Sequence, residues 1–218
     1  GFVYTRVNPH DVPFPVLIRM IFGKPEPIES QFNSCYATLL NLYAQFGSKL
    51  LEIYPRSFHY FQSNKKGRQK GVSALERKLE LLRTLGHLTN DGLTDKGKFA
   101  CWMYGYARLL SELLEDGYLD TLTATSLAVL LIALVFEPRR NEACPRLPSH
   151  LDALQKRAFS TLRKINIKET YLKIYPPTKE AHFHLAEAME AWMAGCRFSE
   201  LERHTTADEG EIIRYFRM

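Results

Sequence analysis

The sequence has few of the features that mark a secreted or membrane protein. Its four cysteines, Cys35, Cys101, Cys144 and Cys196, stand singly, so neither a disulfide framework nor a C-x-x-C metal site is predicted. The start of the chain lacks the charged, apolar and small-residue segments of a signal peptide. The most apolar stretch, Leu127–Phe136, has ten residues, whereas a membrane span needs about eighteen. We therefore expect a reduced, cytoplasmic protein without a membrane partner, in which this stretch is a buried core helix.

The sequence also lacks a recognisable set of catalytic or metal-binding residues. No Ser/His/Asp or Cys/His combination stands at a catalytic spacing. His182 and His184 are two residues apart, and on the helix expected there they would point about 200° apart, which prevents them from sharing a metal ion. Both are expected at the surface or at a helix end. We predict no catalytic residue, no metal site and no cofactor within this chain.

One string nearly matches a nucleotide-binding loop. GLTDKGKF, from Gly92 to Phe99, fits the pattern G-x-x-x-x-G-K but lacks the hydroxyl that follows it and binds magnesium. The pattern also requires a preceding buried strand, whereas a helix end and a turn precede this string. We interpret the string as the tip of a hairpin followed by a helix start, with Thr94 as the helix cap.

The chain does contain enough apolar sequence for a core, together with unevenly distributed positive charge. Its 218 residues are 45% hydrophobic and 24% charged, with a net charge of +5, which fits one large or two small packed domains. Arg139–Tyr175 carries nine Lys/Arg and three acids, and Arg56–Gly71 carries five cations and no acid. Lys179–Met218 is acidic, with five cations and eight acids. Basic segments of this kind are typical of polyanion-binding proteins, although solvated helix faces give the same pattern.

Apolar residues recur at helical spacing along most of the sequence, which predicts a mainly α fold. A short strand and a proline-rich extended path are expected in a lead-in at residues 1–26. A helix is expected from Glu29 with Ser30 as its cap, then a short helix at Tyr54–Phe61 and a third along the leucines from Val72 to Leu82. QSNKKGRQKG, before the third helix, reads as a basic loop.

Three helices followed by a hairpin are the order of a winged helix, which we predict at residues 27–100. The hairpin is expected to pair segments around Leu88 and Leu93 across an Asn-Asp-Gly turn. An all-α helical bundle is predicted at 101–218. Its expected helices are a long one from Phe99 to Gly117, one capped by Thr123 and stopped by Pro138, one from Leu151 to Ile165, and one from Ala181 to Gly195. Ser199 and Glu202 fit a capping box for a further helix.

The last helix of the sequence has hardly begun when the sequence ends. Thr206 and Glu209 fit a second capping box. A helix shorter than about twelve residues is marginal unless it packs against something, so we expect this helix to continue beyond Met218. Arg214 and Arg217 on it are candidate contacts to a nucleic-acid strand. The cations of the basic loop, Lys65, Lys66, Arg68 and Lys70, are candidate phosphate contacts. Ordinary solvent exposure is the alternative for both sets.

Five segments, taken together and in order, resemble the C-terminal part of the superkiller-type DExH-box RNA helicases. They are ESQFNSCYATLLNL, RSFHYFQ, LRTLGHL..DGLTDKGKFA, LLSELLEDGYLDTLTATSLAVLLIALVFEPR and AMEAWMAGCRFSELERHTTADEGEIIRYFR. The resemblance implies that the first residues follow a RecA-like motor domain, that a winged helix comes next, and that a ratchet-type helical bundle closes the region. It also implies that the motor of the parent protein uses ATP and magnesium.

The resemblance extends to the last helix. Glu209, Gly210, Ile213 and Arg214 match the start of the family's ratchet helix, which lies along the single strand that leaves the motor. Arg217 stands where a basic residue is usual. Only SNKKGRQKG stands where exosome-associated members carry a long arch, which indicates an archless relative, and Tyr106-Ala107 replaces an acidic pair that the family often has. The Walker loop, the DExH box and the arginine finger are absent, so this chain cannot itself hydrolyse ATP.

Two hypotheses of different class follow. In the first, the chain forms the accessory C-terminal domains of an ATP-dependent RNA helicase and guides single-stranded RNA or DNA from upstream RecA-like motor domains of the same chain. In the second, it is a free-standing winged-helix DNA-binding regulator that reads base edges with Ser73–Leu85. Acidic and basic residues alternate along that segment, and such a helix is poorly suited to enter a DNA groove. A protein-interaction scaffold without nucleic-acid affinity is a third interpretation.

Overall fold

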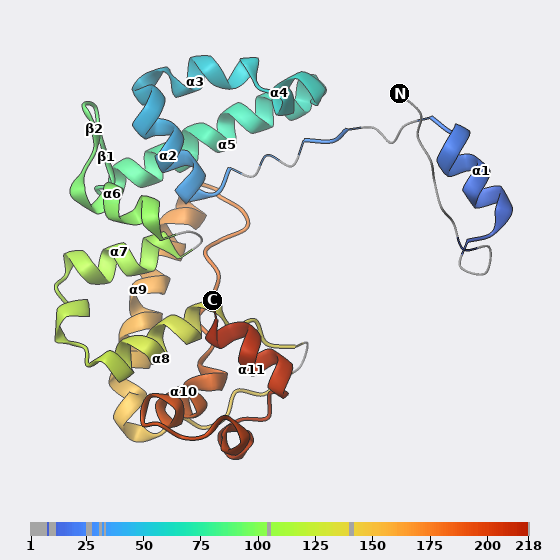
Figure 1. The fold of residues 1–218 in the computed structure, drawn as a ribbon. Helices are drawn as coiled ribbons and strands as arrows, with labels where there is room; N and C mark the ends of the chain where they lie inside the picture. The colour runs from blue at the N-terminus through green and yellow to red at the C-terminus, as the bar shows by residue number, and fades with distance from the viewer. Residues whose placement is uncertain are drawn as a thin grey trace. The chain divides into compact units, whose positions relative to one another are not determined.

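The chain forms two compact units, Gly1–Phe32 and Asn33–Met218, which are described separately (Figure 1). The computed structural model describes residues 8, 12–24, 28–30, 32, 34–103, 106–139 and 142–217. The predicted mainly α fold is confirmed, because the described residues form helices and a single two-stranded sheet. The predicted domain boundary at residue 100 lies inside the second unit, and the assignment of a winged helix and a bundle to its two parts stays a prediction.

The first unit contains a helix where an extended path was expected. Helix α1 spans Phe14–Phe22 and follows Pro13, whose φ is −57°. Proline is tolerated in the first turn of a helix, because its missing N–H would have no partner there and its fixed φ suits the helix. The prolines therefore begin this helix, and the prediction of an extended lead-in is wrong for these residues. The strand predicted at the first seven residues lies outside the described residues.

The second unit is an assembly of helices with one hairpin (Figure 1). Its helices are α2 (Tyr36–Phe46), α3 (Leu50–Ile53), α4 (Phe58–Gln62), α5 (Lys65–Thr84), α6 (Asp95–Trp102), α7 (Ala107–Glu115), α8 (Ala124–Val135), α9 (Asp152–Tyr171), α10 (Ala186–Met193) and α11 (Glu209–Phe216). Its strands are β1 (Leu88–Thr89) and β2 (Gly92–Leu93). Short 3-10 helices precede α9 and α10 and lie between α10 and α11.

The hairpin and the helix that follows it have the predicted form. Leu88 pairs with Leu93 in antiparallel register, and the Thr94 hydroxyl accepts a hydrogen bond from the Gly97 N–H at 3.0 Å. Gly97 is buried, and a Cβ at this position would lie 2.2 Å from the His87 carbonyl oxygen. The second glycine of the near-match to a nucleotide-binding loop therefore serves close packing between the hairpin and α6.

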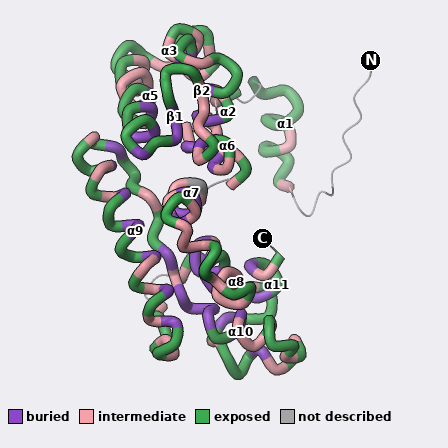
Figure 2. The backbone as a smooth tube through the Cα atoms, turned by 90° about the vertical axis from the view of Figure 1, so that its left-hand side faces the viewer, coloured by how far each residue is buried: buried purple, intermediate pink, exposed green. Residues whose placement is uncertain are grey.

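Helix α8 is the centre of the apolar core in the later part of the unit. It buries Val129, Leu130, Ile132, Ala133 and Leu134 and packs against α10, α9 and α11. Figure 2 shows buried backbone where these helices meet. Within the described residues, no helix combines the length and the apolar character of a membrane span. The prediction of a buried core helix is confirmed.

Both ends of α8 are where the sequence predicts them. The Thr123 hydroxyl accepts a hydrogen bond from the Ser126 N–H at 3.1 Å, and the chain becomes extended at Phe136, two residues before Pro138.

Other predicted helix limits are wrong. The single helix expected from Phe99 to Gly117 is two, because α6 packs against α2 whereas α7 packs against α9, and Met103 leaves the helical conformation. The helix expected from Glu29 begins at Tyr36, and the Ser30 hydroxyl instead accepts a hydrogen bond from the Phe32 N–H.

Neither predicted capping box forms as expected. Asp208, not Thr206, caps α11 by accepting a hydrogen bond from the Glu211 N–H at 2.9 Å. The segment with Ser199 and Glu202 is a 3-10 helix, Phe198–His204, whose start has no side-chain cap.

A buried ion pair joins helices that are far apart in the sequence. The Arg108 guanidinium on α7 pairs with the Glu169 carboxylate on α9, whose side chain is 0% exposed. The Tyr36 hydroxyl on α2 donates to Glu169 Oε1 at 3.0 Å, and the Thr178 N–H donates to Glu169 Oε2 at 2.7 Å. The Arg108 guanidinium also lies 3.6 Å from the centre of the Tyr36 ring. Burial raises the pKa of the Tyr36 hydroxyl although Arg108 lowers it, which keeps the hydroxyl protonated and able to donate.

Two further polar contacts link the hairpin region to α7. His87 Nε2 lies 2.7 Å from the Ser111 hydroxyl, and both residues are fully buried. Lys96 forms ion pairs with Glu112 and Glu115. Together with the Arg108–Glu169 pair, these contacts explain why residues 33–218 form one unit.

The buried pair generates a stability prediction. Arg108→Met should lower the free energy of unfolding by about 3–5 kcal/mol, because Glu169 would remain buried without its counter-charge. Urea unfolding followed by circular dichroism measures this change. Lys98→Met, which breaks the exposed pair between Lys98 and Asp95, is the matched control and should change little. Equal effects of the two substitutions would contradict the importance of the buried pair.

His87 generates a pH prediction. Burial, followed by the charges of Lys96 and Arg108, lowers the pKa of His87 to about 3. As the pH falls, His87 is therefore protonated in the unfolded chain before it is protonated in the folded chain. The free energy of unfolding is then lower than above pH 6.5, and it falls by up to about 1.4 kcal/mol per pH unit as the pH approaches 3. Unfolding of the natural chain and of His87→Gln, compared at pH 7, 6 and 5, measures this loss. A stability difference that does not vary with pH would contradict it.

Candidate nucleic-acid interface

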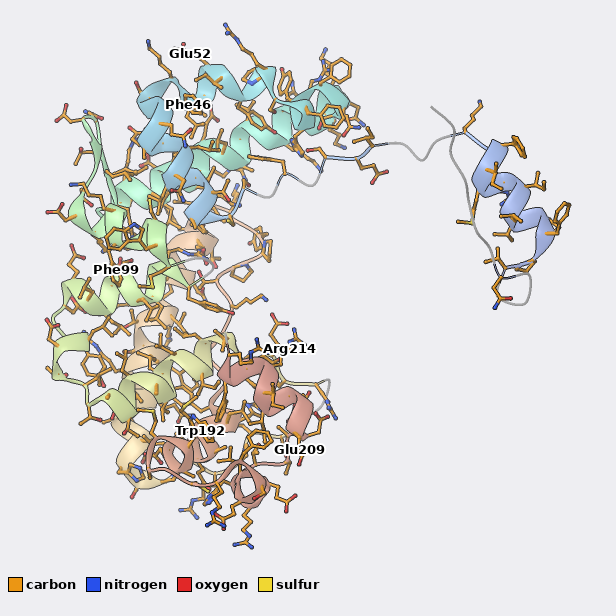
Figure 3. All side chains as sticks on the ribbon, viewed as in Figure 1. Phe46, Glu52, Phe99, Trp192, Glu209 and Arg214 are labelled. Carbon is orange, nitrogen blue, oxygen red and sulfur yellow. The ribbon has the colours of Figure 1, made fainter. Side chains whose placement is uncertain are left out.

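Helix α11 presents one face to the core and the opposite face to solvent. Ile212 and Tyr215 are buried, whereas Gly210, Ile213, Arg214 and Arg217 are exposed. With 3.6 residues per turn, these four exposed positions share one face. Figure 3 shows Glu209 at the start of the helix and Arg214 farther along it. The structure thus brings Arg214 and Arg217 together, beside an isoleucine that is 45% exposed.

Contacts from another segment fix the start of α11. The Arg139 guanidinium donates to Asp208 at 2.7 Å and to Glu211 at 2.9 Å. The hydrogen bond from the Glu211 backbone N–H, followed by the one from the Arg139 side chain, lowers the pKa of the Asp208 carboxyl. The Tyr215 ring packs on the Phe136 ring with centres 4.9 Å apart. Arg139 was not singled out from the sequence, because nothing local connects it to residues about seventy positions later.

The two arginines of the exposed face have few competing partners. The Arg214 guanidinium lies 5.2 Å from the centre of the Tyr215 ring. The nearby Glu137 carboxylate is paired with Lys179, and this pair lowers the pKa of Glu137 more than Arg214 does. Among the described residues, no ion pair or hydrogen bond involves the Arg217 side chain. Both guanidinium groups are therefore available to a ligand.

The predicted basic loop is a helix. Lys65, Lys66, Arg68 and Lys70 lie in the first two turns of α5, and the Asn64 side chain caps this helix by accepting a hydrogen bond from the Gly67 N–H at 2.8 Å. The prediction of a loop is wrong because glycine is normally unfavourable inside a helix, whereas Gly67 and Gly71 both lie within α5. Gly71 instead allows close packing, since a Cβ there would lie 2.2 Å from the Tyr54 hydroxyl oxygen.

The four cations of this helix start have different roles. Arg68 donates to the carbonyl oxygens of Tyr60 at 3.0 Å and Phe61 at 3.1 Å, and its guanidinium lies 5.1 Å from the centre of the Tyr60 ring. It therefore satisfies the end of α4. Lys65, Lys66 and Lys70 are exposed, and within the described part of the chain none of them has an ion pair.

The placement of these lysines is electrostatically unfavourable for the helix. The start of a helix carries partial positive charge, so acidic residues stabilise it and cations destabilise it. The first turn of α5 contains no acidic residue. The lysines and the helix dipole together produce a positive surface that favours an anion.

The two basic surfaces are separate. Figures 1 and 2 show the start of α5 beside α3 and α4, and α11 beside α8 and α10 at the opposite end of the second unit. The structure does not bring the α5 lysines together with Arg214 and Arg217.

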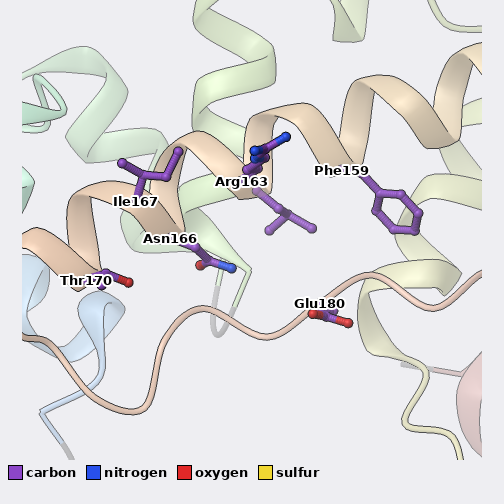
Figure 4. A pocket seen from close by; sticks show the side chains of 7 residues that line it. Phe159, Arg163, Asn166, Ile167, Thr170 and Glu180 are labelled. Carbon is purple, nitrogen blue, oxygen red and sulfur yellow. The ribbon is translucent and has the colours of Figure 1, made fainter.

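A pocket on α9 combines charges of both signs. It has a volume of about 510 Å³ and lies between α9 and the segment that contains Glu180 (Figure 4). Arg163 and Glu180 line it from opposite sides, and among the described residues Asn166 Oδ1 is buried without a hydrogen-bond partner. Because the two charges offset each other, this pocket does not extend the basic surfaces.

A metal cluster and the near-match to a nucleotide-binding loop can both be tested on the described residues. These residues contain no cluster of three or more His, Cys, Asp or Glu side chains that could hold a metal ion. The string from Gly92 to Phe99 does not fit ATP, because it forms a hairpin strand and a helix start and because Lys98 pairs with Asp95.

The two histidines lie at the start of a helical segment, as expected, but one of them is buried. His182 is extended and His184 lies in a 3-10 helix, so their rings are 5.9 Å apart. His184 is also buried, with its ring stacked on Phe136. The expected surface position is therefore wrong for His184, which lies at the helix end but is buried.

Comparisons with known proteins agree in one family. The model of the DSHCT (NUC185) domain matches residues 90–218, more than half of the chain. Superkiller complex protein 2 of Homo sapiens is 30% identical over 143 residues, which cover 63% of this chain and 11% of the relative. ATP-dependent RNA helicase mtr4 of Schizosaccharomyces pombe is 29% identical over 159 residues, which cover 67% of this chain and 14% of the relative. Exosome RNA helicase MTR4 of Homo sapiens is 30% identical over 158 residues, with the same coverage. The chain thus spans about a seventh or less of these curated relatives.

The lysines of α5 generate a prediction about stability. Lys65→Glu and Lys66→Glu should each raise the free energy of unfolding by about 0.3–1 kcal/mol at low salt, because a negative charge at a helix start complements the dipole. Thermal unfolding followed by circular dichroism measures the gain. Lys164→Glu, an exposed position in the middle of α9, makes the same charge change away from a helix end and should give no gain. A loss of stability at positions 65 and 66 would contradict the prediction.

Proposed function

Since this chain belongs to the DSHCT (NUC185) family, we propose that it is an accessory region of an ATP-dependent RNA helicase and that the exposed face of α11 guides a single strand of nucleic acid. The motor would consist of upstream RecA-like domains of the same chain. ATP and magnesium would act there, because the residues present here do not fit them. The parent protein would work in the cytoplasm.

The observation that carries this proposal is the arrangement of α11. Its core face is anchored by Ile212 and Tyr215, and two of the acids at its start, Asp208 and Glu211, are paired with Arg139. Its outer face presents Arg214 and Arg217 around Ile213. Guanidinium groups contact phosphates or stack on bases without selecting a sequence. A rigid helix with this face suits a strand that must slide past it.

The exposed lysines of α5 supply a second, purely electrostatic contact. Lys65, Lys66 and Lys70 are flexible cations, and their binding to phosphates would release condensed counterions. Their distance from α11 means that a strand contacting both surfaces would extend along the second unit.

The rival function, a duplex-reading regulator, is less well supported. In the proposed recognition segment Ser73–Leu85, the leucines at 75, 79, 81, 82 and 85 are buried. The exposed residues between them are Glu76, Arg77, Glu80, Arg83 and Thr84. Acidic side chains would meet the DNA phosphates as often as basic side chains would, which opposes docking of this helix in a groove. Selection from random duplexes should therefore give no consensus site.

Binding of single-stranded RNA tests the proposal. The log of the affinity for a 20-residue uridine oligonucleotide should fall with log salt at a slope of about −2 to −3, the value for three or four neutralised phosphates. Fluorescence anisotropy measures this slope, and a matched DNA oligonucleotide compares the two nucleic acids. Arg214→Ala with Arg217→Ala should make the slope shallower by about 1.4, since each lost contact removes about 0.7.

The control variant carries Arg197→Ala with Arg203→Ala. These two arginines are exposed on the segment before α11, so their loss removes the same charge and should leave the slope nearly unchanged. Salt-insensitive binding, or no binding at low salt, would refute the guiding role.

A further inference from the structure

An apolar pocket lies at the end of α11, on the core side of the helix, where Tyr215 and Phe216 contribute to its lining. It has a volume of about 500 Å³, within the range of about 300–1,000 Å³ that is typical of small-ligand sites. The end of α6, one side of α8 and the end of α11 form its walls. Aliphatic side chains and methionines make up most of the lining, and four aromatic residues complete it: Trp102, Tyr106, Tyr215 and Phe216.

Trp102 is the most accessible of these rings. Its side chain is 82% exposed, although a large apolar side chain of this kind is normally buried. The Phe216 ring, in contrast, is braced by Trp192, with ring centres 6.1 Å apart, and Tyr215 is buried against Phe136. The pocket therefore has a fixed aromatic floor and one aromatic side chain that is free to stack.

Positive charge lies at the edge of this pocket. The Arg214 guanidinium is 5.2 Å from the centre of the Tyr215 ring, which places a cation of the α11 face at the pocket wall. Lys179 is paired with Glu137, so this ion pair adds no net charge, and Arg214 is the cation that matters here. Cations at the edge of an aromatic pocket are complementary to a nucleotide, which carries a flat apolar base and a negative phosphate.

We propose that this pocket receives an unstacked base of the single strand that α11 guides, with Trp102 as the stacking surface and Arg214 as the neighbouring phosphate contact. This inference rests on the proposed function and adds a base-binding site to it. Stacking on an aromatic ring is tolerant of sequence, because every base has a flat face. The pocket would hold a base at each pause of the strand without selecting which base it is.

Intrinsic fluorescence tests the proposal directly. The sequence contains two tryptophans, so Trp192→Phe leaves Trp102 as the single tryptophan, which long-wavelength excitation selects over the tyrosines. In this variant, the 20-residue uridine oligonucleotide should quench the emission of Trp102 over the concentration range in which anisotropy reports binding. A ribose-phosphate oligonucleotide of the same length without bases should bind through its phosphates and leave the emission unchanged.

Affinity measurements complete the test. Trp102→Ala should weaken binding of the uridine oligonucleotide about 5- to 150-fold, the equivalent of stacking one base at about 1–3 kcal/mol, and should leave binding of the base-free oligonucleotide unchanged. Trp102→Phe should retain most of the affinity. Phe61→Ala, which truncates another strongly exposed ring on α4, is the control and should bind as the natural chain does. Thermal unfolding of each variant shows whether the fold is preserved.

The possible failures are distinguishable. If both oligonucleotides bind equally and Trp102 emission does not change, the base-binding pocket is overturned while the guiding role of α11 stands. If neither oligonucleotide binds, both are overturned. If Trp102 emission shifts to shorter wavelength with protein concentration and sedimentation shows self-association that Trp102→Ala abolishes, the pocket is a contact between copies of this chain and the proposal is overturned.

Discussion

The arrangement of the second unit depends on the buried contact between Arg108 and Glu169. Both carboxylate oxygens of Glu169 are used, one by Tyr36 and Arg108 and the other by Thr178. A buried ion pair adds little net stability compared with apolar residues of the same size, but neither partner can leave the other without a large penalty. The network therefore acts mainly on specificity: it fixes the directions in which α2, α7 and α9 meet.

This rigidity has a consequence for function. The His87–Ser111 contact and the Lys96 ion pairs join the hairpin region to α7 beside the same network. Under the proposed function, these contacts would hold the basic start of α5 and the exposed face of α11 in one arrangement. A strand of nucleic acid would meet a fixed track, and any movement along it would have to come from a motor outside this unit.

The sequence predicts local features well and long-range ones poorly. Thr94 and Thr123 cap the helices that they were expected to cap, and Leu88 pairs with Leu93, because each of these signals lies within a few residues. The start of α5 was misread because Gly71 serves a distant contact with Tyr54. Arg214 and Arg217 were found as candidates because they share one short helix. Arg108 and Glu169 are 61 positions apart, and no local pattern links them.

The charge of a segment in the sequence is likewise a poor guide to the charge of its surface. Residues 179–218 carry more acids than cations, which argues against nucleic-acid binding there. In the folded unit, however, Asp208 and Glu211 are paired with Arg139, and Glu190 is paired with His150, both from outside that segment. Arg139 offsets part of the negative charge of Asp208 and Glu211 at the start of α11. Arg214 and Arg217 lie farther along the helix, so a segment that is acidic by composition presents two exposed arginines where the later part of α11 faces solvent.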